Sequence, residues 1–162
     1  MIYIGIDNGV TGSIGIIDEN NEYFFYKTPV RTELSYTKAK KNISRVKTQE
    51  LKAILKPYEG KNVIVAIERP MVNPTRFTAS ISAVRALEAT LIVVEELKLP
   101  FFYIDSKKWQ KELLPSGIKG STELKKASLQ ISLRMFPECE KILNSQKDGD
   151  ALLIAKHLKN TY

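Results

Sequence analysis

Four acidic residues occupy positions where binding or catalysis is expected. Asp7 ends an alternating apolar segment, IYIGID, and Glu68 ends a continuous β-branched run, VIVAIE. Asp148 and Asp150 open the last amphipathic segment, KDGDALLIA. Open α/β sheets bind ligands at the carboxyl ends of their strands. We therefore expect two acids from strand ends and two from a helix start to meet at one edge of a sheet.

A cluster of carboxylates suits a divalent cation. Like charges repel, and burial disfavours the charged form, so the cluster is costly unless a cation is bound. Hard oxygen ligands in this number favour Mg²⁺, with Mn²⁺ as a substitute. Two such ions about 3.5–4 Å apart activate a water and stabilise the leaving oxygen of a phosphodiester. No nucleophilic side chain is required, which agrees with a chain that holds one histidine and one cysteine.

Each acid also has an ordinary structural role open to it. Asp7 precedes a turn sequence, Asn-Gly, and Glu68 precedes Arg69, with which it can form a local ion pair. Asp148 and Asp150 suit the first turn of a helix, where the dipole favours negative charge. The metal hypothesis therefore rests on the order of these positions along the chain and not on any one residue.

The elements that would position the acids form an α/β pattern. Alternating or β-branched runs predict strands at residues 2–7, 12–18, 22–27, 63–68 and 101–104. Apolar residues at helical spacing predict helices at about 48–56, 76–98, 106–113, 122–135 and 148–158. The polar stretch 29–47 is interpreted as a loop. Hairpin strands followed by alternating strands and helices predict a mixed sheet with helices on its faces, in one domain over 1–162.

Composition favours a polyanionic partner. The chain has 162 residues, with 25 Lys and Arg against 18 Asp and Glu, a net charge of +7. A basic protein with no nucleic-acid role fits this charge equally well. A single cysteine, Cys139, fits a reducing compartment. We expect no signal peptide and no membrane span, because we see no basic leader and no run of membrane length.

The acidic blocks resemble a known family. IGIDNGVTGSIGIID, VAIERP and DGDALLIA are similar to the three acidic blocks of the RuvC-type Holliday junction resolvases, and the likeness is strongest to the short phage-type members. It covers nearly the whole chain. It implies an RNase H-like fold with a five-stranded sheet, a homodimer, and two Mg²⁺ ions per active site. It also implies paired cuts in four-way or other branched DNA, and a cytoplasmic setting in a bacterial or phage-infected cell.

The resemblance also implies roles for individual residues. Asp7, Glu68 and Asp150 match the first, second and last metal-binding acids of the family. The family commonly has an acid or histidine three residues before the last aspartate, but Lys147 stands there in this chain. Asp148 is the nearest acid. Residues two apart do not share a helix face, so Asp148 is predicted as a ligand only if it lies just outside the first turn.

Basic residues are predicted to contact DNA. The family carries a lysine near the scissile phosphate, after a strand that FFYI resembles, and Lys111 fits its register best. Lys107 and Lys108 remain alternatives. The residues predicted to contact phosphates are Arg31, Lys38, Lys40, Lys41, Arg45, Lys47, Arg69, Arg76, Lys107 and Lys108. A solvated linker is the alternative for residues 31–47, and solvated lysines are the alternative for 107–111.

The predicted helix at 76–98 carries two stripes, one of large apolar residues and one mostly of small residues. Two such stripes predict two packing partners, the sheet and a second subunit. Three other functions stay open. An actin-like ATPase or sugar kinase begins with a similar hairpin, but it needs two such domains. An RNase H or YqgF-like RNA-processing nuclease shares the fold. A non-catalytic branched-DNA-binding protein is compatible with the displaced Asp148.

Overall fold

A mixed five-stranded sheet forms the centre of the protein in the computed structural model, which describes all 162 residues. The strand order is β3-β2-β1-β6-β7. The strands are β1 (Ile2–Asp7), β2 (Ser13–Ile17), β3 (Tyr23–Lys27), β6 (Val63–Glu68) and β7 (Phe101–Ile104). The first three form an antiparallel meander, and β6 and β7 continue the sheet in parallel with β1. The predicted α/β class with a mixed five-stranded sheet is confirmed.

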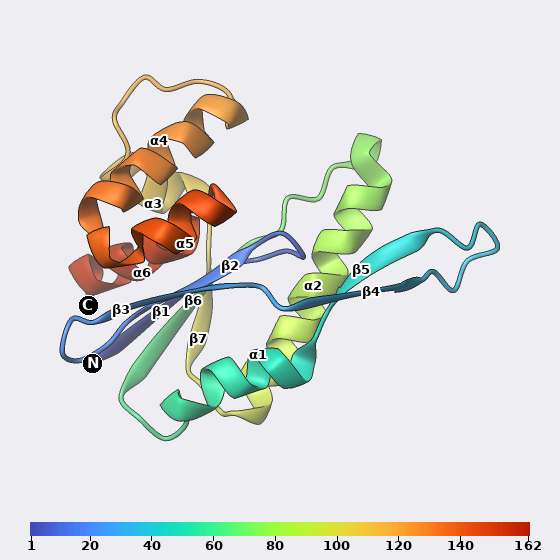
Figure 1. The fold of residues 1–162 in the computed structure, drawn as a ribbon, viewed down its shortest axis with the longest axis horizontal. Helices are drawn as coiled ribbons and strands as arrows, with labels where there is room; N and C mark the ends of the chain where they lie inside the picture. Colours follow the sequence, from blue (N-terminus) through green and yellow to red (C-terminus); the bar gives the residue numbers. More distant parts are fainter.

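Helices cover both faces of this sheet (Figure 1). One face carries α1 (Thr48–Leu55) and α2 (Phe77–Glu96), and the other carries α3 (Ser106–Leu113), α4 (Ser121–Met135), α5 (Glu140–Gln146) and α6 (Asp150–Thr161). Short 3-10 turns are η1 (Lys56–Tyr58), η2 (Pro74–Arg76) and η3 (Pro137–Cys139). Strands β1 and β6 lie between two layers of helices and are buried on both faces, which explains the continuous β-branched run of β6.

Two glycines let α6 lie directly on the sheet. Gly5 and Gly15 are paired across β1 and β2. A Cβ on Gly5 would lie 2.2 Å from the carbonyl oxygen of Ala151, and one on Gly15 would lie 2.4 Å from the backbone nitrogen of Leu152. No side chain fits between the helix and these strands. The close approach brings the first turn of α6 beside the carboxyl end of β1, where Asp7 lies.

The interpretation of residues 29–47 as a loop is wrong. They contain an antiparallel hairpin of β4 (Val30–Leu34) and β5 (Asn42–Val46), which projects from the body beyond α2 (Figure 1). The signal was weak because most of the hairpin is solvated, so it has no apolar face to reveal its period. The sequence patterns also did not reveal α5, a helix of seven residues, and the last helix was predicted to begin two residues before α6 does.

The expectation that no segment reaches membrane length also needs correction. The helical segment Pro74–Glu96, formed by η2 and α2, is long and apolar enough to cross a membrane by length and composition alone. Core helices of water-soluble proteins pass the same test. However, only 28% of its most apolar window is buried within this chain. The helix therefore has an apolar face that the rest of the protein leaves uncovered.

Candidate metal centre

Parallel pairing of β1 and β6 places Asp7 beside Glu68. Ile6 is aligned with Ile67, and the two acids are the next residues on each strand. Both strands therefore deliver a carboxylate to the same edge of the sheet. The loop after Asp7 is held to α2, because the Asn8 side-chain amide donates a hydrogen bond to the carbonyl oxygen of Ala83 at 3.1 Å.

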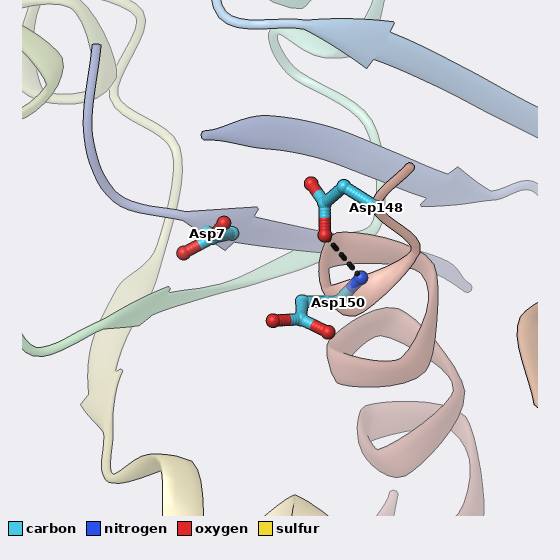
Figure 2. A group of neighbouring side chains, drawn as sticks. All are labelled: Asp7, Asp148 and Asp150. Atoms are coloured by element: carbon cyan, nitrogen blue, oxygen red, sulfur yellow. Dashed lines mark hydrogen bonds between the residues drawn. The ribbon is translucent and has the colours of Figure 1, made fainter. Parts of the chain in front are cut away.

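A tight turn brings Asp148 and Asp150 to this edge. Lys147 ends α5 in the left-handed region, at φ 53°. Gly149 follows, and a Cβ there would lie 2.1 Å from Ser132 Oγ. The turn aims Asp148 back toward the first turn of α6, where its Oδ1 accepts a hydrogen bond from the Asp150 backbone N–H at 3.1 Å (Figure 2). Asp148 thus lies just before the N-cap residue Gly149, and its side chain accepts from the first N–H of α6 while it joins the acids.

Three aspartates come together in the structure. Asp7, Asp148 and Asp150 each offer a carboxylate oxygen, and these atoms all lie within 4.8 Å of one another (Figure 2). Glu68 lies outside this tight group, but Asp150 and Asp148 still raise its pKa by Coulomb repulsion. The structure therefore gathers the four predicted acids at one edge of the sheet, with three of them close enough to share a cation.

Burial and mutual repulsion raise the pKa values of Asp7, Glu68 and Asp150. Burial is the main cause in each case. The pKa of Asp7 is raised well above its usual value, with Asp148 as the next cause. The pKa of Glu68 rises to about 7 and that of Asp150 to about 6. A cation among them would favour the charged forms and reverse these shifts.

The environment of Glu68 fits such a cation. Its Oε2 is buried and has no hydrogen-bond partner. The indole N–H of the fully buried Trp109 acts on this carboxyl group as a donor and lowers its pKa, although the two groups do not reach full hydrogen-bond geometry. A buried carboxylate oxygen without a partner beside three clustered aspartates is a donor set that suits Mg²⁺ or Mn²⁺.

Lys125 is the lysine whose charge acts on these acids. It lowers the pKa of Asp7, Glu68 and Asp150, whereas Lys111 is not among the causes of any of these shifts. Lys125, which lies on α4, was not among the residues predicted from the sequence. A signal was present: Lys125, Ser128 and Ser132 follow one another at helical spacing, as a polar stripe on a predicted helix.

Two hollows are lined by basic residues and include a residue linked to the acids, either Lys125, whose charge acts on them, or Arg69, which follows Glu68. One, of about 470 Å³, is lined by Lys125, Lys126 and Lys147 together with Ser121, Thr122, Leu129 and Asn144. The other, of about 580 Å³, contains all three lysines predicted near the scissile phosphate. Its lining residues are Arg69, Pro70, Met71, Asp105, Ser106, Lys107, Lys108 and Lys111. Within it Arg69 forms an ion pair with Asp105 at 3.2 Å.

The remaining residues predicted to contact DNA lie on the β4–β5 hairpin, directly after it, or at the start of α2. Arg31 and Arg45 both pair with Glu33, at 3.0 and 2.8 Å, and brace the hairpin. Lys47 pairs with Glu50 at 2.7 Å. The exposed lysines of the hairpin tip have no acidic partner within salt-bridge distance; they are Lys38, Lys40 and Lys41. Arg76 is exposed at the start of α2.

Comparison with known proteins identifies the fold. The chain matches RuvC of T. thermophilus in complex with a Holliday junction substrate, with a TM-score of 0.60 and 15% identity over 97% of this chain and 91% of that chain. Another Thermus thermophilus RuvC structure matches with a TM-score of 0.49 and 17% identity over 97% and 92% of the two chains. No family model and no curated protein matches the sequence. The chain has the RNase H-like α/β fold of RuvC.

Proposed function

We propose that this protein is a divalent-metal-dependent endonuclease that resolves four-way or other branched DNA by paired phosphodiester hydrolysis. The observation that carries the proposal is the cluster of Asp7, Asp148 and Asp150 beside Glu68, on a fold shared with a junction-bound RuvC. The lysines that line the two hollows support a phosphate-bearing substrate, because positive side chains bind the phosphates of a nucleic-acid strand.

The acids would hold the cation, and the lysines would hold the substrate. Asp7, Glu68, Asp148 and Asp150 are the proposed ligands of two Mg²⁺ ions, for which Mn²⁺ would substitute. A divalent cation bound there would supply Lewis-acid stabilisation of the developing charge on the phosphate oxygens. Lys125 would neutralise phosphate charge next to the acids, whereas Lys107, Lys108 and Lys111 would bind the flanking backbone. The buried walls around Glu68 would exclude bulk water.

A homodimer would supply the second cut. The uncovered face of α2 exposes large apolar side chains, with Phe77 70% exposed, Val84 46% and Ile81 36%. Together with Val72 and Pro74 they line an apolar hollow of about 280 Å³. Pairing two copies through this face would bury these side chains and supply two active sites for one junction. A cytoplasmic location is part of the same proposal.

Junction cleavage tests the function. The protein is incubated with a labelled, immobile four-way DNA junction in Mg²⁺, Mn²⁺ or EDTA, beside duplex, flap and RNA–DNA hybrid substrates. Metal-dependent, symmetric paired nicks in the junction are expected, and Asp7→Asn should abolish them. Cutting of the hybrid alone would move the function to RNA processing. Junction binding without any cutting would favour a non-catalytic DNA-binding protein.

Solution mass tests the dimer separately. Sedimentation at micromolar concentration should give twice the chain mass of 18.4 kDa. Val84→Glu should yield monomers, because a charge in the centre of an apolar interface is costly to bury. Lys141→Glu, an exposed change on the opposite layer, is the control and should leave the mass unchanged. A monomeric unsubstituted protein would overturn the dimer proposal but not the metal centre.

A further inference from the structure

Two buried serines each hold one carboxylate of the cluster. Ser13, the first residue of β2, donates a hydrogen bond from Oγ to Asp148 Oδ2 at 2.6 Å. Ser128, on α4, donates one to Asp150 Oδ1. The two serines are only 1% and 2% exposed. Burying a hydroxyl is unfavourable unless it is hydrogen-bonded, so both side chains depend on these contacts.

The contacts leave coordination sites free. An ionised carboxylate offers about four lone-pair sites. Asp148 uses one on Oδ1 for the Asp150 backbone N–H and one on Oδ2 for Ser13. Held at both oxygens, its carboxylate is fixed in orientation while one lone pair on each oxygen remains for a cation. Asp150 keeps Oδ2 free of any side-chain donor, since Ser128 contacts Oδ1.

We infer that Ser13 and Ser128 are positioning residues that orient Asp148 and Asp150 for divalent metal binding. The inference rests on the proposed metal centre and deepens it. Like charges in the cluster repel, and both aspartates are only half-buried, so without a donor each carboxylate would turn away from the others toward solvent. Groups that orient metal ligands typically contribute about 10–100-fold to metal affinity.

Ser132 provides a matched control. It is also buried on α4, one turn beyond Ser128, and its Oγ donates to the carbonyl oxygen of Gly149 at 3.2 Å. It therefore contacts the same turn without contacting a carboxylate. A serine-to-alanine change at Ser132 removes one buried hydroxyl, as at Ser13 and Ser128, and any effect that is merely structural should be common to all three.

Mn²⁺ binding to the DNA-free protein tests the inference, with free Mn²⁺ measured by electron paramagnetic resonance. Ser13→Ala and Ser128→Ala should each weaken binding by about tenfold or more, whereas Ser132→Ala should leave it nearly unchanged. Ser13→Thr keeps the hydroxyl and should restore much of the affinity. In an Asp148→Asn background, Ser13→Ala should have no further effect on Mn²⁺ affinity, because the group that it orients is no longer a charged ligand.

Thermal unfolding shows which variants are folded, and Ser128→Ala carries the test alone if Ser13→Ala does not fold. Equal Mn²⁺ affinity in all three alanine variants would overturn the positioning role, even if the unsubstituted protein cuts junctions. Mn²⁺ binding with the expected serine pattern but no cleavage of any DNA would overturn the proposed function and leave the positioning role standing. Absence of Mn²⁺ binding by the unsubstituted protein would overturn both.

Discussion

The carboxyl groups of the acid cluster and of the β4–β5 hairpin have pKa values shifted in opposite directions. In the cluster, burial and neighbouring acids raise the pKa of Asp7, whereas in the hairpin a hydrogen bond from Arg45 lowers the pKa of Glu33. Glu33 forms ion pairs with two arginines of its own hairpin. The three aspartates of the cluster lie mainly beside one another. The carboxylate of Glu33 is therefore neutralised within the hairpin, whereas the carboxylates of the cluster would be neutralised by the proposed cation.

We therefore expect the acid cluster to serve catalysis and the hairpin to serve DNA binding. Changes in the cluster should affect cleavage or metal affinity, and changes in the hairpin should affect DNA affinity and its salt dependence. The cluster lies where the α6 backbone packs directly on the sheet. The hairpin projects into solvent (Figure 1) and presents unpaired lysines at its tip.

The largest effect is expected at Asp7. Asp7→Asn should reduce junction cleavage by about 10³-fold or more, because it removes the negative charge of a deeply buried, proposed metal ligand. Junction affinity should stay the same or increase, since one negative charge near phosphate is removed. Cleavage and gel-shift assays measure the two effects. Glu33→Gln in the hairpin is the matched change and should leave cleavage intact. Loss of both activities in folded Asp7→Asn would contradict the metal-site assignment.

The next largest effect is expected at Gly5, where an added methyl group should reduce the stability of the fold. Its Cβ would lie 2.2 Å from the Ala151 carbonyl oxygen and 2.6 Å from the Ala155 nitrogen, both backbone atoms that cannot move aside. Gly5→Ala should lower the free energy of unfolding by about 3 kcal/mol. Thr32→Ala, exposed on β4, should stay within about 0.5 kcal/mol. Chemical denaturation checks both, and an unaffected Gly5→Ala would refute the close packing of α6.

A comparison of Lys125 with Lys126 tests whether cleavage depends on a lysine near the acids or only on positive charge in the same hollow. Lys125→Ala should reduce cleavage by about 100-fold at saturating metal. Lys126 pairs with Glu123 at 2.9 Å and is not a cause of the acids' pKa shifts, so Lys126→Ala should change cleavage little. Single-turnover kinetics on a junction measure both. Equal losses in the two variants would assign Lys125 a general role in binding phosphate.

The cluster should make stability depend on pH in the absence of divalent cations. The folded-state pKa of Glu68 is raised from 4.5 to about 7, and that of Asp150 from 3.8 to about 6. Between about pH 4 and pH 7 the folded state therefore binds more protons than the unfolded chain. The contribution of these two acids to stability is greatest below about pH 4 and is lost as the pH rises toward 7. Each pKa unit corresponds to about 1.4 kcal/mol before solvent screening.

Thermal unfolding in EDTA at pH 5 and pH 8 checks this sign. The melting temperature should be lower at pH 8, and Mg²⁺ should restore it there, because bound metal stabilises the charged carboxylates. The pKa of Glu33 is shifted downward, so the Glu33→Gln variant should still show the lower melting temperature at pH 8. A melting temperature that rises from pH 5 to pH 8 in EDTA would show that the acids are less buried than the structure indicates.

The smallest effect on cleavage is expected at the hairpin tip. Replacing Lys38, Lys40 and Lys41 together by glutamine should weaken junction binding and reduce the slope of log affinity against log salt by about 0.9 for each phosphate that the tip no longer neutralises. Cleavage at saturating protein should be nearly unchanged. Fluorescence anisotropy over a salt series measures the slope. An unchanged slope would remove the hairpin from the DNA interface, whereas a change in oligomeric state would make it a subunit contact.

The sequence by itself determined the sheet and the acids. Strands β1 and β6 are buried on both faces, so their apolar runs could be recognised without knowledge of the fold, and the acid that ends each run was conspicuous. Asp150 was recognisable because it begins a helix with a clear apolar stripe, Ala151 to Leu158. These signals are local, since each depends on the burial of one continuous segment.

Only the tertiary structure decided which polar groups meet. Ser13 and Asp148 are 135 residues apart, and Ser128 and Asp150 are 22 apart, so no local pattern links them. That the charge of Lys125, and not that of Lys111, lowers the pKa values of Asp7, Glu68 and Asp150 depends on how α3 and α4 are placed around the cluster. The hairpin strands pair with each other in solvent, outside the main sheet, and therefore lack the apolar periodicity from which strands are predicted.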